Sequence, residues 1–144
     1  MNSTDRDHIA AFLAKWQGSE GNERANYQSF FCDLCRALGV DEPPPKGNIA
    51  GVPYCFDKDI KFFEDSEKTR FADFYKEGCF LIEAKQGSDS SSKGHGKRST
   101  KTDRDNLQKA FNQAKSYAYN RLLGALPPFL MVCDIGSHFE IWVI

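Results

Sequence analysis

The fold of this chain is decided by residues 71–85, which read FADFYKEGCFLIEAK. Two short runs of aromatic and aliphatic residues flank the polar, glycine-containing segment 76–79, and this pattern predicts a β-hairpin. Gly78 suits the left-handed position of a three-residue loop over residues 77–79. Because the runs on both sides are apolar on nearly every position, we expect both faces of this hairpin to be covered by other parts of the chain.

The predicted register places three charged side chains together. Tyr75 pairs with Leu81, so Asp73 lies opposite Glu83, with the two Cβ atoms about 5 Å apart. Strand alternation puts Lys85 on the same face as these two carboxylates. Charges on a covered face are costly unless they are paired or bind a metal ion, and their presence therefore indicates a functional site. The opposite face is expected to carry Ala72, Phe74, Phe80, Ile82 and Ala84.

Length and composition limit the possible classes. The chain has 144 residues with 40% hydrophobic and 13% aromatic content, which is enough for one domain with a proper core. The net charge of −1 gives no global positive field, so any attraction to nucleic acid must be local. The first residues lack the apolar segment of a secretion signal, and no run approaches membrane-spanning length. A cytoplasmic protein is the simplest expectation.

The rest of the sequence predicts an α/β architecture. Helical periodicity is expected from a Ser3 or Thr4 cap to Gly18, over residues 22–38 and over residues 103–123. Strand patterns occupy residues 54–62, 129–133 and 139–144. A strand, a helix and a buried strand in succession predict a crossover that places 129–133 parallel to 80–85. The expected fold is a mixed β-sheet of about five strands flanked by helices. Because the chain ends within an apolar strand, we expect a fragment of a longer protein.

The five cysteines form an odd, scattered set rather than a disulfide framework. Cys32 and Cys35 have the spacing of a zinc or redox motif, but no second pair of Cys or His at ligand spacing accompanies them. They lie within a predicted helix, so packing is the favoured interpretation. The three histidines are isolated from one another and are not expected to bind metal.

The paired carboxylates are suited to a specific chemistry. Asp73 and Glu83 are hard oxygen ligands of the kind that Mg²⁺ prefers, in company with water and substrate phosphate. Lys85, two residues further along the strand, can orient or deprotonate a water, or stabilise charge on a phosphate. The alternative is a structural ion pair within the sheet. The apolar surroundings favour a functional site.

This arrangement resembles the PD-(D/E)xK nucleases, which have the restriction-endonuclease-like fold, with Asp73, Glu83 and Lys85 as the motif. Ala72 stands where the family name has proline. More narrowly, three segments are similar to the N-terminal endonuclease module of single-chain restriction–modification enzymes of types IIL and IIG, in which nuclease, N6-adenine methyltransferase and DNA-recognition parts are fused. These segments are residues 23–30, 78–87 and 110–118.

The resemblance implies a type II restriction endonuclease domain that hydrolyses DNA phosphodiester bonds with Mg²⁺, for which Mn²⁺ can substitute. Asp73, Glu83 and the Ala84 carbonyl would hold the metal, and Lys85 would position water. Glu23 shares a helical stripe with Tyr27 and, as in related nucleases, would supplement the metal site; a glutamate favoured by the helix dipole is the alternative. The expected partners are double-stranded DNA, C-terminal methyltransferase and target-recognition domains, and a second copy on DNA.

Two further groups of residues are expected to bind DNA. Gln113 and Tyr117 match a Gln-x-x-x-Tyr motif of related nucleases that lies near the scissile phosphate, in a polar helical column from Lys109 to Arg121. A solvated helix face is the alternative. The loop over residues 86–102 is expected to be a mobile basic arm that grips phosphates or only aids solubility. Its basic residues, with the start of the next helix, are Lys93, His95, Lys97, Arg98, Lys101 and Arg104.

Two other functions are alternatives to a DNA endonuclease. An exonuclease or an RNA-directed enzyme on the same scaffold ranks last, because the sequence gives no feature for threading a substrate. A protein that keeps this fold without catalysis would be a nucleic-acid-binding or partner-binding module. The intact set of Asp73, Glu83 and Lys85 argues against it. The chain contains neither an Asn-Pro-Pro-Tyr methyltransferase motif nor a glycine-rich S-adenosylmethionine loop, so methylation is not expected from these residues.

Overall fold

A computed structural model describes residues 2–19, 23–45, 53–62, 65–87, 97–98, 100–120 and 125–144. It confirms the predicted α/β class. The elements are α1 (Ser3–Trp16), α2 (Glu23–Leu38), β1 (Tyr54–Phe62), β2 (Asp65–Lys76), β3 (Phe80–Lys85), α3 (Lys101–Ala118), β4 (Phe129–Asp134) and β5 (His138–Val143). Within the described residues, no helix combines the length and apolar character needed to cross a membrane.

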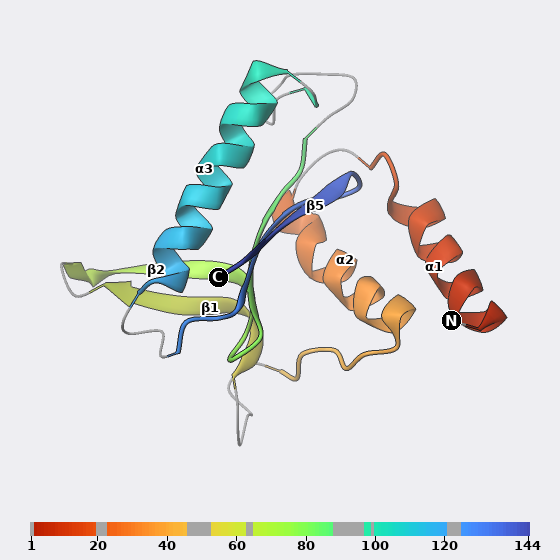
Figure 1. Ribbon diagram of the computed structural model, residues 1–144, viewed down its shortest axis with the longest axis horizontal. Helices are drawn as coiled ribbons and strands as arrows, with labels where there is room; N and C mark the ends of the chain where they lie inside the picture. Colours follow the sequence, from red (N-terminus) through yellow and green to blue (C-terminus); the bar gives the residue numbers. More distant parts are fainter. Residues whose placement is uncertain are drawn as a thin grey trace.

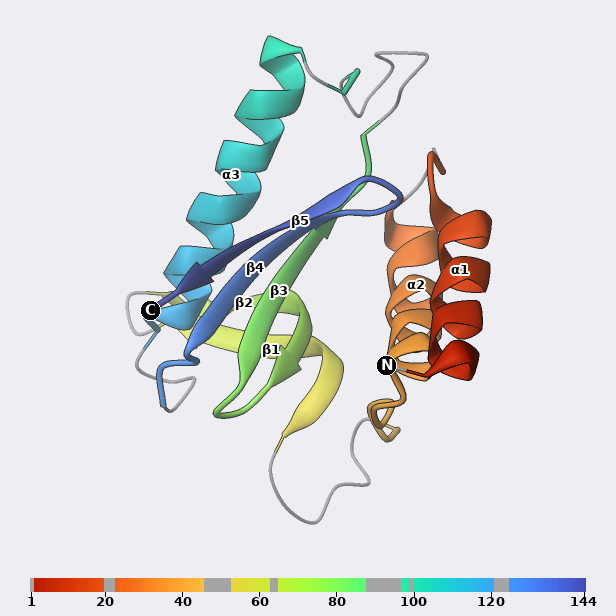
Figure 2. The same cartoon turned by 45° about the vertical axis from the view of Figure 1, so that its right-hand side comes forward.

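The five strands form one mixed sheet in the order β1-β2-β3-β4-β5. Only β3 and β4 run parallel, and the other neighbours are antiparallel. Helix α3 connects the parallel pair, which confirms the predicted crossover. Helices α1 and α2 lie side by side over one face of the sheet and α3 lies over the other (Figures 1 and 2). The hairpin faces are therefore both covered, as its apolar sequence required.

The central hairpin has the predicted register. Tyr75 pairs with Leu81 and Phe74 with Ile82. The loop is closed by a hydrogen bond from the Cys79 amide to the Lys76 carbonyl at 3.0 Å. Gly78 has a φ of 69°, the left-handed conformation that glycine adopts without steric cost. Local sequence alone was sufficient here because the loop type sets the pairing of the strands.

Two aromatic-rich cores hold the helices to the sheet. On the side of α1 and α2, Phe31 is fully buried and its ring lies 5.0 Å from that of Phe74. On the side of α3, Phe111 contacts Trp142 with ring centroids 4.3 Å apart. Cys35 belongs to the first core, as its predicted packing role requires.

The structure corrects the predicted faces at Ala72. This residue packs in the α3 core, whereas Phe74 packs against α2. The β1–β2 ladder pairs Phe56 with Phe74 and Lys58 with Ala72 but records no pair at the position between them, where Asp57 has a φ of 50°. The alternation of side chains between the two faces is interrupted at this point. The end of β1 after Asp57 and the start of β2 before Asp73 therefore lie beneath α3 (Figure 1).

Two helix limits also differ from the predictions. The cap of α1 is Asn2, not Ser3 or Thr4, because its side chain accepts the Asp5 amide at 2.8 Å while the Asp5 carboxylate accepts the Asn2 amide at 3.1 Å. This reciprocal capping box satisfies two amides at once. Helix α3 ends at Ala118 rather than at residue 123, and residues 121–124 lie outside the described residues.

Candidate active site

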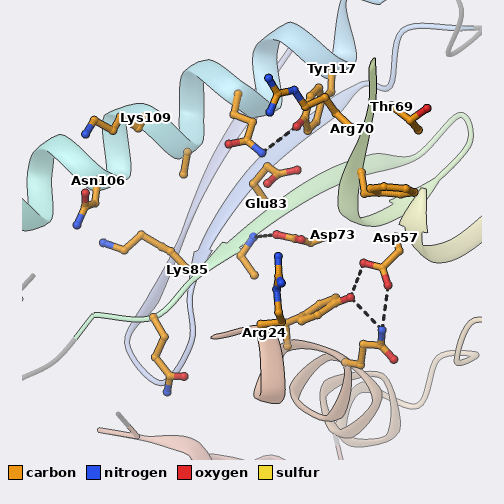
Figure 3. Close-up of a pocket in the computed structure, with 17 residues that line it drawn as sticks. Arg24, Asp57, Thr69, Arg70, Asp73, Glu83, Lys85, Asn106, Lys109 and Tyr117 are labelled. Atoms are coloured by element: carbon orange, nitrogen blue, oxygen red, sulfur yellow. Dashed lines mark hydrogen bonds between the residues drawn. The ribbon is translucent and has the colours of Figure 1, made fainter. Parts of the chain in front are cut away.

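A cavity of about 1030 Å³ opens between the sheet and helices α2 and α3 (Figure 3). Residues from five elements, α2, β1, β2, β3 and α3, line its wall. Its charged lining residues are Arg24, Asp57, Arg70, Asp73, Glu83, Lys85 and Lys109. Both the predicted carboxylates and the predicted lysine therefore border the same space.

Asp73 and Glu83 come from neighbouring strands and face this cavity (Figure 3). The regular ladder ends at the Phe74–Ile82 pair, so these two residues follow at the next position of each strand. The Asp73 carboxylate accepts the backbone amide of Ala84 at 2.8 Å, which fixes its orientation beside β3. Glu83 is only 5% exposed. The pairing of β2 with β3 therefore brings both carboxylates to the same cavity.

Lys85 closes one end of the cavity but points toward α3 (Figure 3). Its ammonium lies 2.8 Å from the Asp103 carboxylate and 3.5 Å from the Asp103 carbonyl oxygen. The side chains of both residues are at least nine-tenths buried. Asp103 was missed by the sequence reasoning, which treated the start of α3 only as a helix boundary.

The Gln113–Tyr117 pair of α3 lies on the cavity wall. Gln113 donates a hydrogen bond of 2.9 Å to the Tyr117 hydroxyl. Burial is the main cause that raises the pKa of Tyr117, followed by the charge of Glu83, with a smaller contribution from Asp73. These causes favour the protonated form, so the Tyr117 hydroxyl can donate a hydrogen bond at neutral pH.

A second hydrogen-bonded group borders the cavity at β1. The Tyr27 hydroxyl donates to Asp57, and Gln28 donates to the Tyr27 hydroxyl at 2.9 Å and to Asp57 at 3.3 Å. Burial and then the hydrogen bond to Asp57 raise the pKa of Tyr27. Asp57 lies within the predicted strand pattern of residues 54–62. The irregular backbone at this residue, which no local pattern signals, places it on the cavity wall.

Cationic side chains line the cavity from three directions. Arg24 comes from α2, Arg70 from β2 and Lys109 from α3 (Figure 3). Lys109 belongs to the predicted polar column, but Arg24 and Arg70 were not predicted. Arg24 lies within residues 23–30, one of the segments that resemble the restriction–modification enzymes. That resemblance was the sequence signal that could have indicated Arg24.

Other predicted DNA-binding residues do not line this cavity. Lys97, which precedes α3, and Lys101, the first residue of α3, are exposed. Arg98 is not part of a solvent-exposed arm: its guanidinium donates to both Asp134 oxygens, at 3.2 and 3.3 Å, and to the Ser19 and Ile135 carbonyls, at 3.2 and 2.8 Å. The Glu23 side chain and the residues Lys93, His95 and Arg121 lie outside the described part of the structure.

The donor set fits a hard divalent cation such as Mg²⁺. Protein sites usually give this ion one or two carboxylates and leave its remaining positions to water and substrate phosphate. Asp73, Glu83 and the Ala84 carbonyl are oxygen donors of this kind. The described residues contain no group of three or more His, Cys, Asp or Glu side chains placed to hold a metal, so a fully protein-enclosed site is not formed by them.

Comparison with known families gives a match along nearly the whole chain. A family model described as "MmeI, N-terminal domain" covers residues 5–143. Searches of curated proteins and of solved structures found no match. MmeI is a type IIL restriction–modification enzyme. The chain therefore belongs to the MmeI N-terminal domain family, in agreement with the restriction–modification resemblance carried by segments 23–30, 78–87 and 110–118.

Proposed function

We propose that this protein is a Mg²⁺-dependent DNA endonuclease domain of a restriction–modification enzyme. One observation carries the proposal: Asp73 and Glu83 from neighbouring strands face a single cavity that also has Arg24, Arg70 and Lys109 in its wall. The carboxylates can bind a metal ion, and the basic side chains beside them can bind phosphate groups. This combination suits the hydrolysis of a phosphodiester. Membership of the MmeI N-terminal domain family supports the same reaction class.

The chain's residues divide the work. Asp73, Glu83 and the Ala84 carbonyl would hold Mg²⁺, which when bound would supply a Lewis acid for the developing phosphate charge. Lys85 orients the attacking water. Tyr117, kept protonated by burial and by the charge of Glu83, donates to a phosphate oxygen. By family likeness the products are a 5′-phosphate and a 3′-hydroxyl.

The proposal extends to the partners of this domain. Double-stranded DNA is the substrate, and methyltransferase and target-recognition domains in the same enzyme select the sequence. A second copy on DNA would provide the second strand cut, since one such site hydrolyses one strand. A restriction enzyme meets its DNA in the cytoplasm, where we place this protein. Glu23, Lys97 and Lys101 remain proposed contacts for the metal site and for DNA.

Removal of the metal provides the direct test. The protein should nick supercoiled plasmid in Mg²⁺, lose this activity in EDTA, and regain it when Mn²⁺ is added in excess. Gel analysis of the relaxed form measures each rate. Cutting that persists in EDTA contradicts the proposal, and plasmid binding without nicking in either metal favours the non-cleaving module.

Lys109 offers a separate test of DNA binding at the cavity. Lys109→Ala should weaken binding to all DNA sequences alike and reduce the slope of log Kd against log salt by about one, since one phosphate contact is lost. Fluorescence anisotropy in EDTA measures this without cleavage. Lys115→Ala removes an exposed lysine of the same helix that does not line the cavity, and serves as the matched control. Equal effects of the two changes would show that α3 binds DNA elsewhere or only through net charge.

A further inference from the structure

The ion pair between Lys85 and Asp103 is unusual in its burial. The Lys85 side chain is 8% exposed and that of Asp103 is 6% exposed, with 2.8 Å between ammonium and carboxylate. Lys85 is the last residue of β3, and Asp103 lies in the first turn of α3. The chain between them includes the whole connection from strand to helix, so the pair joins two elements across the end of the cavity.

Asp103 itself is held from several directions. Its backbone amide donates to the Thr100 side chain, the N-cap of α3, at 3.3 Å. Gly87 packs so closely that a Cβ added there would lie 3.2 Å from the Asp103 carboxylate and 2.9 Å from Arg98 Cγ. The carboxylate is therefore enclosed between Lys85 and the backbone of the residues that follow β3, and it has little room to move.

We propose that Asp103 is the positioning residue of Lys85, and this inference rests on the proposed nuclease function. Asp103 does not line the cavity and so does not touch substrate; it acts through Lys85. The ion pair sets the direction in which the lysine side chain leaves the strand and holds its ammonium at the cavity end. The Lys85 side chain is therefore preorganised before DNA binds, and it does not need to change its conformation at the reaction step.

The pair also separates the charges of the site. Lys85 and Glu83 lie on the same face of β3, two residues apart, so each is the other's nearest charged neighbour along the strand. Asp103 gives Lys85 a counter-charge that is separate from the carboxylates of Asp73 and Glu83. Without it, the lysine would be drawn toward Glu83 and away from its position at the cavity end.

A purely structural ion pair would act differently, and kinetics can separate the two roles. Asp103→Asn keeps the size of the side chain but removes its charge. The single-turnover cutting rate at saturating DNA should fall by about 10- to 100-fold, because a displacement of about 1 Å in a positioned group costs up to about 100-fold. The Kd for DNA, measured by anisotropy in EDTA, should stay within about twofold of wild type, since Asp103 is not on the cavity wall.

Two comparisons make the test specific. Asp105→Asn removes a charge from the same turn of α3 and controls for net charge and the helix dipole. In a Lys85→Met background, Asp103→Asn should add less than about a threefold further loss, because residues acting as a unit are not additive. If the asparagine variant fails to fold, Asp103→Glu keeps the charge, displaces the carboxylate by one methylene, and should also slow cutting.

The outcomes distinguish this inference from the proposed function. No metal-dependent cutting by wild type overturns both. Wild-type cutting with an unchanged rate in folded Asp103→Asn, or in Asp103→Glu where the asparagine variant is unfolded, overturns the role of Asp103 alone. A lower Tm with a normal rate per folded molecule shows a structural ion pair and also overturns it. The positioning role is supported if Asp103→Asn slows cutting at unchanged DNA affinity. This slowing should be absent in Asp105→Asn and should disappear in the Lys85→Met background.

Discussion

Asp73→Asn should reduce plasmid nicking by roughly 1000-fold or more while leaving the fold intact. A bound metal contributes several kcal/mol of charge stabilisation, and each ~1.4 kcal/mol corresponds to a factor of ten in rate. The fold should survive because asparagine has the same size and retains an oxygen that can accept the Ala84 amide, the hydrogen bond that aspartate makes at 2.8 Å. Glu83→Gln should lose activity to a similar extent.

Calorimetry gives this prediction a readout that does not depend on catalysis. Wild-type protein should bind Mn²⁺ at a site that both Asp73→Asn and Glu83→Gln weaken. Asp7→Asn, an exposed change on α1 away from the cavity, controls for net charge. Nicking at the wild-type rate by either site variant would remove these carboxylates from the reaction. Metal binding that survives both changes would place the cation elsewhere.

Arg98→Ala should destabilise the protein by about 3–5 kcal/mol. Asp134 is 1% exposed and its carboxylate accepts hydrogen bonds from Arg98 and from the Gly87 amide, at 2.9 Å. Removing Arg98 takes away the counter-charge of a buried carboxylate and leaves it the hydrogen bond from the Gly87 amide, which accounts for this cost. The midpoint of urea unfolding should fall with an unchanged m-value.

A second-site change tests this cause. Asp134→Asn in the Arg98→Ala background removes the buried charge and should recover a large part of the lost stability. Arg36→Ala breaks ion pairs to Asp33 and Glu42 at an exposed position, so it should change stability little. A small effect of Arg98→Ala would show instead that water reaches Asp134, and that residues 97–98 are held loosely.

The hairpin shows how much of the site local sequence can predict. Gly78 and its flanking residues determine the loop, the loop determines the register, and the register places Asp73 beside Glu83. Each step involves residues fewer than a dozen positions apart. The crossover to β4 was also predictable, because a buried parallel strand needs a covering helix between it and its neighbour.

Arg98 shows where the same reasoning fails. Its neighbours in the sequence are polar and basic, which favoured an exposed arm. The guanidinium nevertheless binds Asp134 of β4, the carbonyl of the next residue, Ile135, and the carbonyl of Ser19, which follows α1. Composition describes the average character of a segment, whereas burial of one side chain depends on partners far along the chain. The same holds for Asp57, whose inward placement follows from an irregular pairing between β1 and β2.

Sequence by itself determined the type and order of the helices and strands, the hairpin register and the pairing of Asp73 with Glu83, because these depend on periodicity, loop geometry and short separations. Tertiary structure alone decided that Lys85 pairs with Asp103, that Arg98 is buried, and that Arg24 and Arg70 line the cavity. The physical reason is that a charged side chain settles where its desolvation is compensated. That compensation comes from groups brought close only when the helices close over the sheet.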